Sequence, residues 1–199
     1  MRPQLWIVAG PNGAGKSTLT GKYLRHRVPI VDPDEIARRL NPTDPSLSTV
    51  ALQAGRLASA ERTRMLHSNL SFAVETTLTG RGPRILMRQA SAIGFKVNLI
   101  YIGLHDVALS LGRVRQRIDD GGHSVPFADI HRRYPRSLAN LAEALALTDR
   151  AFVLDGSGSR RRLLLSRADG RVKWSAATWP DWAASAIPVA LRDRTLEPK

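Results

Sequence analysis

A glycine-rich segment near the start of the chain, AGPNGAGKST (9–18), has the residue types and spacing of a phosphate-binding loop. Its glycines allow backbone N–H groups to turn toward phosphate oxygens, and the helix expected to follow adds the positive end of its dipole. An apolar segment precedes the loop, as this motif requires. We therefore expect ATP to bind here, through the nine residues Gly10, Pro11, Asn12, Gly13, Ala14, Gly15, Lys16, Ser17 and Thr18.

Two side chains of this loop are expected to do chemistry. Lys16 should reach the β- and γ-phosphates, and the Ser17 hydroxyl should be a ligand of Mg²⁺. The same loop is common in ABC transporter ATPases, which also need an LSGGQ-like signature and an acid pair that closes an apolar strand. The sequence contains neither feature, which argues against a transporter subunit.

Acidic residues follow the second expected strand, in VDPDEIARRL (31–40). Asp32 stands at an N-cap position, Pro33 at the first helical position and Glu35 three residues after the cap, so these residues predict a capping box. Asp34 is left without a structural task. It either stabilises the helix N-terminus or, because ligands gather at this edge of α/β sheets, accepts the proton of an acceptor hydroxyl as a catalytic base.

Glu75 closes the apolar run SFAVE (71–75), and Thr76 and Thr77 follow it. A carboxylate at the end of a buried strand usually lies at the mouth of a site, because burial within the sheet costs too much. We interpret Glu75 and Thr76 as candidates for binding the acceptor, with Glu75 also able to orient Mg²⁺ through water. The alternative is that Glu75 simply meets solvent.

An arginine-rich segment, HDVALSLGRVRQRIDDGGH (105–123), combines an apolar helical stripe with basic flanks. Arg113 and Arg117 are four residues apart and share a flank. GGHSVP (121–126) offers a hinge, and the next helix carries Arg132 and Arg133 before Pro135, which should break or kink it. A lid of this kind excludes water and brings guanidinium groups to a transferring phosphoryl group, although solvated helix faces explain any single arginine equally well.

These residues require an alternating α/β framework to bring them together. Apolar runs predict strands at 4–10, 28–32, 71–76, 95–104 and 150–155, and a closing strand at 163–168. Helices are expected at 16–26, from 32, at 48–67 and 83–92, twice after the fourth strand, and near WPDWAASA (179–186). We therefore predict one domain over 1–199: an α/β P-loop kinase-like three-layer sandwich with a mainly parallel central sheet, a core at 4–155, a helical, arginine-rich lid at 106–136, and a C-terminal closing segment at 160–199.

The composition limits the classes of function. The chain has 199 residues, 43% of them hydrophobic, and no cysteine, so disulfides, thiolate catalysis and cysteine-bound zinc are excluded. No apolar run is long enough to cross a membrane, and we expect a cytoplasmic protein. The net charge of +13 is compatible with nucleic acid, a polyphosphate substrate or an acidic protein partner. Because no basic stripe with interleaved aromatic residues is present, nucleic acid is the least expected of the three.

The chain resembles the zeta toxin family of P-loop kinases, most of all its short stand-alone bacterial members. The resemblance rests on four segments: VAGPNGAGKST, DPDEIARRL, SFAVETTLTGR and GGHSVPFADIHRRYPRSL. The resemblance implies ATP and Mg²⁺ as cofactors, UDP-N-acetylglucosamine as the phosphorylated acceptor, and a cognate antitoxin that blocks the nucleotide site. It also implies roles for residues at matching positions: Asp34 as the base, Glu75 as an acid that binds the substrate, and Arg117 and Arg133 as arginines that stabilise phosphate.

The combined expectation is a kinase that transfers the γ-phosphate of ATP to a hydroxyl of a nucleotide sugar. Its catalytic residues would be Lys16, Asp34, Arg117 and Arg133, with Asp34, Glu75, Thr76 and Arg113 binding the acceptor and Ser17 the metal. Two alternatives remain open: a switch or motor that hydrolyses nucleotide, and a polynucleotide or nucleoside kinase.

Overall fold

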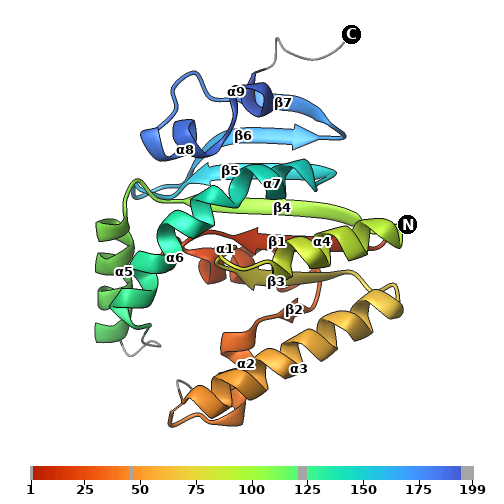
Figure 1. Ribbon diagram of the computed structural model, residues 1–199, viewed down its shortest axis with the longest axis vertical. Helices are drawn as coiled ribbons and strands as arrows, with labels where there is room; N and C mark the ends of the chain where they lie inside the picture. Colours follow the sequence, from red (N-terminus) through yellow and green to blue (C-terminus); the bar gives the residue numbers. More distant parts are fainter. Residues whose placement is uncertain (1, 45–46, 121–124, 194–199) are drawn as a thin grey trace.

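The computed structural model describes residues 2–44, 47–120 and 125–193. Strands form a seven-stranded sheet in the order β2-β3-β1-β4-β5-β6-β7, in which β1 to β5 are parallel and the last two antiparallel (Figure 1). The mainly parallel α/β sheet that the sequence predicts is confirmed. The strands are β1 (Gln4–Ala9), β2 (Ile30–Val31), β3 (Phe72–Thr76), β4 (Lys96–Gly103), β5 (Arg150–Asp155), β6 (Arg162–Ala168) and β7 (Arg171–Ser175).

Helices pack on both faces of the sheet. They are α1 (Lys16–Tyr23), α2 (Pro33–Leu40), α3 (Ser48–His67), α4 (Gly82–Ala92), α5 (Val107–Asp119), α6 (Phe127–Ala139), α7 (Leu141–Ala146), α8 (Asp181–Ala186) and α9 (Val189–Arg192). Successive side chains of a strand point to opposite faces, so β1 contributes to two cores. Leu5 and Ile7 pack in the cluster that contains α4 and α7, whereas Val8 packs in the cluster with Leu19 of α1.

Three local expectations differ from the structure. The first helix ends at Tyr23 rather than near residue 26, because the N–H groups of Leu24 and Arg25 both bond to the carbonyl of Thr20 and form a turn. The second strand is only Ile30–Val31, because it is the edge strand and pairs with β3 alone. Beyond the closing strand, β7 adds a hairpin through a turn at 169–170.

Pro135 does not end α6, so of the predicted break or kink, the break is wrong. The helix continues to Ala139 with the proline inside it. Two side chains near the proline attach this part of the helix to β4 and to Leu104, which follows β4. The Tyr134 hydroxyl donates to the carbonyl of Leu104 at 2.7 Å, and Ser137 shares a hydrogen bond of 3.0 Å with Tyr101 of β4. These contacts hold α6 in place where the proline removes a backbone donor.

Along 2–44, 47–120 and 125–193, every helix is too short or too polar to span a lipid bilayer.

Candidate functional site

The phosphate loop connects β1 to α1 and depends on glycines with unusual backbone angles. Gly10, Gly13 and Gly15 have φ values of +142°, +72° and +85°. A Cβ atom on Gly10 would lie 2.1 Å from the carbonyl oxygen of Ile102, so only glycine fits there. The Ser110 hydroxyl of α5 donates to the carbonyl of Asn12 at 2.6 Å and fixes the outer part of the loop. The loop predicted from the sequence is therefore formed as its spacing requires.

Lys16 is the first residue of α1 and its side chain folds back over the loop. Its Nζ donates to the carbonyls of Gly10 and Pro11, both at 3.0 Å. Burial lowers the pKa of Lys16 to about 8, while the charges of Glu75 and Asp34 act in the opposite direction. An anionic ligand next to Lys16 would favour the charged form of the lysine and raise its pKa again, so binding of the ligand and protonation of Lys16 would support each other.

Ser17 and Glu75 join the loop to the third strand. The Ser17 hydroxyl donates to the Glu75 carboxylate at 2.8 Å, since β1 and β3 are parallel neighbours and end at the same edge of the sheet. Thr76, predicted to bind the acceptor, accepts a hydrogen bond of 3.0 Å from the N–H of Leu78, which has a φ of +59°. Its hydroxyl therefore shapes the turn after β3.

The acids after β2 lie at the same edge. Asp32 caps α2 by accepting from the N–H of Asp34 at 3.0 Å, as predicted. The other half of the predicted capping box differs, because the Glu35 carboxylate pairs with Arg25 at 3.3 Å instead of turning back to Asp32. Burial, together with the charges of Asp34 and Glu75, raises the pKa of Asp32 to about 6. Asp34 itself is exposed.

The three arginines singled out in the sequence have different surroundings. The charge of Arg117 lowers the pKa of Lys16, so this side chain of α5 lies close enough to act on the phosphate loop. Arg113 instead donates to the carbonyls of Ser157 and Gly158 at 3.2 and 3.3 Å, and it ties α5 to the loop after β5. Arg133 pairs with Asp129 one turn earlier in α6, at 2.8 Å.

The predicted lid corresponds to α5 and α6, which pack through Val114, Val125 and Ile130. Asp106 caps α5 by accepting from the N–H of Leu109 at 2.7 Å. Of the predicted hinge GGHSVP, residues 121–124 lie outside the described residues.

Arg161 is a residue of the site that sequence reasoning missed. It lies in the loop between β5 and β6, and its guanidinium donates to the carbonyl of Gly15 at 2.9 Å. The same group would be 2.8 Å from a Cβ atom on Gly15, so it lies directly against the phosphate loop. The run of arginines at 160–162 was visible, but spacing alone could not indicate which of them reaches the loop.

The donor atoms here are compatible with Mg²⁺. Within the described ranges, no three His, Cys, Asp or Glu side chains converge as a complete metal site. Mg²⁺ rarely uses such a cage, since it keeps waters and takes phosphate oxygens with one or two protein ligands. The hydroxyl of Ser17 and the carboxylate of Glu75 supply oxygen ligands of the required kind.

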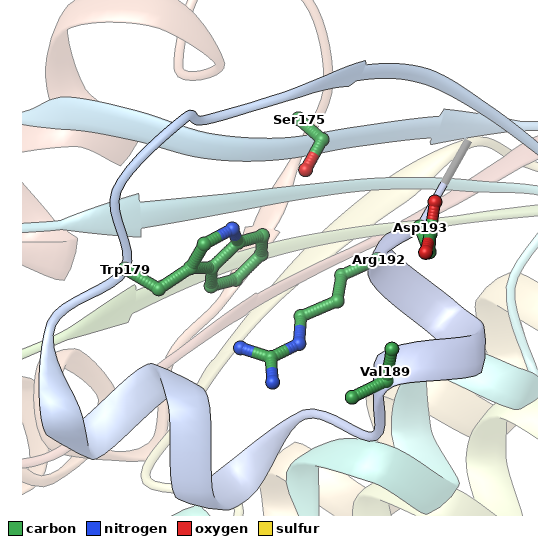
Figure 2. A pocket seen from close by; sticks show the side chains of 5 residues that line it. All are labelled: Ser175, Trp179, Val189, Arg192 and Asp193. Carbon is green, nitrogen blue, oxygen red and sulfur yellow. The ribbon is translucent and has the colours of Figure 1, made fainter. Parts of the chain in front are cut away.

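A hollow of about 470 Å³ lies elsewhere, between β7 and the C-terminal helices (Figure 2). It is lined by Ser175, Trp179, Val189, Arg192 and Asp193, and the Arg192 guanidinium stacks 5.2 Å from the centre of the Trp179 ring. Because β4, β5 and β6 separate β7 from β1, this hollow is not part of the phosphate-loop site.

Comparisons with known proteins agree with this fold. Residues 5–137 match the family model described as an AAA domain. An uncharacterized protein of Haemophilus influenzae is 33% identical over 141 residues, which are 67% of this chain and 99% of that protein. The family match includes the phosphate loop, and the Haemophilus influenzae protein matches two thirds of the chain.

Two solved structures are similar in fold. A chain of the AvrRxo1-ORF1:-ORF2 complex with ATP has a TM-score of 0.70 at 17% identity, over 86% of this chain, which spans only 60% of that chain's length. A chain of the PezAT toxin–antitoxin system of Streptococcus pneumoniae has a TM-score of 0.57 at 19% identity and covers 80% of this chain and 71% of its own. At these identities the similarity concerns the fold, which is that of P-loop kinases.

Proposed function

We propose that this chain, which belongs to the AAA domain family, binds ATP on its phosphate loop and transfers the γ-phosphate to a hydroxyl group of a small acceptor. One relationship supports the proposal most strongly. The loop is linked to acids of two other strand ends, through the hydrogen bond from Ser17 to Glu75 and the electrostatic interaction of Lys16 with Asp34. A donor phosphate and a carboxylate base can therefore act on one acceptor.

In this proposal each residue has a defined task. Lys16 contacts the β- and γ-phosphates, and Ser17, with Glu75 through water, holds the Mg²⁺ that neutralises them. Asp34, exposed at the start of α2, takes the proton of the acceptor hydroxyl. Arg117 is the arginine best supported for stabilising the transferring group, because its charge already acts on Lys16. The guanidinium groups of Arg133 and Arg113 instead contact Asp129 and the carbonyls of residues 157 and 158.

The acceptor we propose is a nucleotide sugar such as UDP-N-acetylglucosamine. The sequence resemblance to zeta toxins suggests this acceptor, and the fold similarity to a chain of the PezAT toxin–antitoxin system is compatible with a toxin-like kinase. A protein antitoxin of acidic character would suit the net charge of +13. Two alternative functions are tested against this proposal. One is a switch that hydrolyses ATP, and the other is a kinase that phosphorylates nucleosides or polynucleotides.

The test is to incubate the protein with γ-labelled ATP, Mg²⁺ and separate nucleotide sugars, nucleosides and oligonucleotides. A kinase labels one acceptor, whereas a switch releases labelled phosphate at the same rate with or without any of them. Asp34→Asn should bind ATP normally and lower transfer by about 10²-fold or more, because it removes the base. Asp181→Asn on α8 is the matched control and should behave as the wild type. Transfer by Asp34→Asn within a few-fold of the wild type would reject Asp34 as the base.

A further inference from the structure

Arg62 lies on the buried face of α3, although it is a charged residue. The buried residues of this helix include Ala54, Ala58 and Met65. Arg62 comes four residues after Ala58 and three before Met65. Its side chain therefore leaves the helix on the same face. α3 packs along α2 and also contacts β2, at the β2 edge of the sheet (Figure 1). This face thus looks toward the strand end that carries Asp32.

The guanidinium of Arg62 is incompletely satisfied. Its Nε atom is buried and has no hydrogen-bond partner among the residues that the structure describes. Burial lowers the pKa of Arg62, while the charge of Asp32 acts on the guanidinium in the opposite direction. A buried donor on a charged group is costly to leave unpaired, and such a group in a native fold calls for an explanation.

We propose that Arg62 forms a subsite for an anionic group, a phosphate or diphosphate, of the acceptor molecule whose hydroxyl is presented to Asp34. The inference rests on the proposed kinase function and deepens it, because it assigns a residue of this chain to the phosphate groups of the acceptor. Arginine suits this task because its planar fork binds phosphate oxygens in pairs and it stays charged when partly buried. Arg38 of α2 also acts on Asp32, so guanidinium groups from two helices offset the acidic surroundings for an incoming anion.

The subsite can be tested without knowing the natural acceptor. The full chain is first saturated with Mg²⁺ and a non-hydrolysable ATP analogue, so that the phosphate loop is filled. UDP-N-acetylglucosamine and inorganic phosphate are then titrated separately by calorimetry. We expect at least one of them to bind, Arg62→Met to weaken that binding by about tenfold or more, and Arg62→Lys to weaken it by about threefold. Arg56→Met, on the exposed side of the same helix, is the matched control and should bind as the wild type does.

The proposal is overturned if neither anion binds the wild type, or if Arg62→Met binds as tightly as the wild type. Circular dichroism establishes whether the methionine variant folds, and if it does not, equal binding by Arg62→Lys and the wild type overturns the proposal instead. Binding of phosphate without UDP-N-acetylglucosamine supports the subsite and argues against a nucleotide sugar. The kinase proposal is tested separately, by the experiment with γ-labelled ATP, and it fails if no acceptor becomes labelled.

Discussion

The Ser17 hydroxyl donates a hydrogen bond of 2.8 Å to the Glu75 carboxylate, although the two residues are 58 positions apart in the sequence. This contact makes the phosphate loop and the end of β3 one electrostatic unit. The charge of Glu75 is also the largest influence that opposes the loss of charge on buried Lys16. The loop therefore depends on a residue outside its own motif.

Glu75→Gln should lower the pKa of Lys16 below its wild-type value of about 8, because the variant removes the carboxylate charge and keeps an oxygen that can accept from Ser17. The measurement is a pH titration of the Lys16 side chain by NMR with carbon labelling next to Nζ. Glu143→Gln is the control, since that carboxylate pairs with Arg84 and Arg88 instead. An unchanged or raised Lys16 pKa in Glu75→Gln would contradict the electrostatic link.

ATP binding should take up a proton at alkaline pH. Free Lys16 has a pKa of about 8 because it is buried, so above pH 8 most molecules carry a neutral lysine. A bound triphosphate favours the charged form, and binding at pH 9 should then absorb close to one proton, about 0.9, with affinity falling as pH rises. Calorimetry in buffers of different ionisation enthalpy measures this number, and Lys16→Met should abolish it. Binding heats that do not depend on the buffer at pH 9 would show that Lys16 is fully charged before ATP arrives.

Asp32→Asn should stabilise the protein at pH 8. Folding raises the pKa of Asp32 from 3.8 to about 6, mainly through burial, so the folded state holds its proton more tightly than the unfolded state. The stability from this group is present below about pH 4 and is lost as pH rises through 6. Asparagine keeps the N-cap and has no charge to bury, so the variant should gain on the order of 2 kcal/mol at pH 8 and little at pH 4.

Urea unfolding at the two pH values measures this difference, with Asp181→Asn as the control on an exposed helix start. An equal gain at pH 4 and pH 8 would mean that the effect comes from packing and not from the charge of Asp32.

Local patterns in the sequence were sufficient for the parts of the site that one segment builds. The loop at 10–18 and the cap at Asp32 were predicted because glycine spacing and capping chemistry operate within a few residues. The hairpin between β6 and β7 was also encoded locally, since Asp169 and Gly170 form an Asp-Gly turn with φ values of 52° and 78°. The prediction overlooked this signal.

Contacts between distant segments could not be predicted in the same way. Arg161 reaches Gly15 across 146 positions, and nothing in the spacing distinguishes it from Arg160 or Arg162. Arg113 was expected to face the acceptor, but its guanidinium bonds to carbonyls at 157 and 158. Helical spacing gives the flank on which an arginine lies, whereas the direction of its long side chain depends on which carbonyls the fold brings near.

Gly10→Ala should destabilise the fold strongly. The new Cβ would lie 2.1 Å from the carbonyl oxygen of Ile102, at a φ of +142° that alanine avoids, so we expect a loss of about 3 kcal/mol or more. Gly55→Ala is the matched substitution, because nothing lies within 4 Å of the added atom on exposed α3. It should raise stability by about 0.5–1 kcal/mol through helix propensity. Thermal unfolding of both variants tests the pair, and a stable Gly10→Ala protein would mean that β1 and β4 do not approach so closely.

Arg161→Ala should weaken the binding of ATP more than that of adenosine. The guanidinium lies against Gly15 at the start of α1, where it adds positive charge beside the backbone N–H groups expected to receive the phosphates. We expect ATP affinity to fall about three- to tenfold, ADP affinity less, and adenosine affinity hardly at all. Arg160→Ala removes the same charge one residue earlier and should change none of the three. A fluorescence titration with labelled nucleotide and unlabelled competitors gives all the affinities. Equal losses for ATP and adenosine would instead mean that Arg161 only braces the loop, because a lost phosphate contact cannot affect a ligand without phosphate.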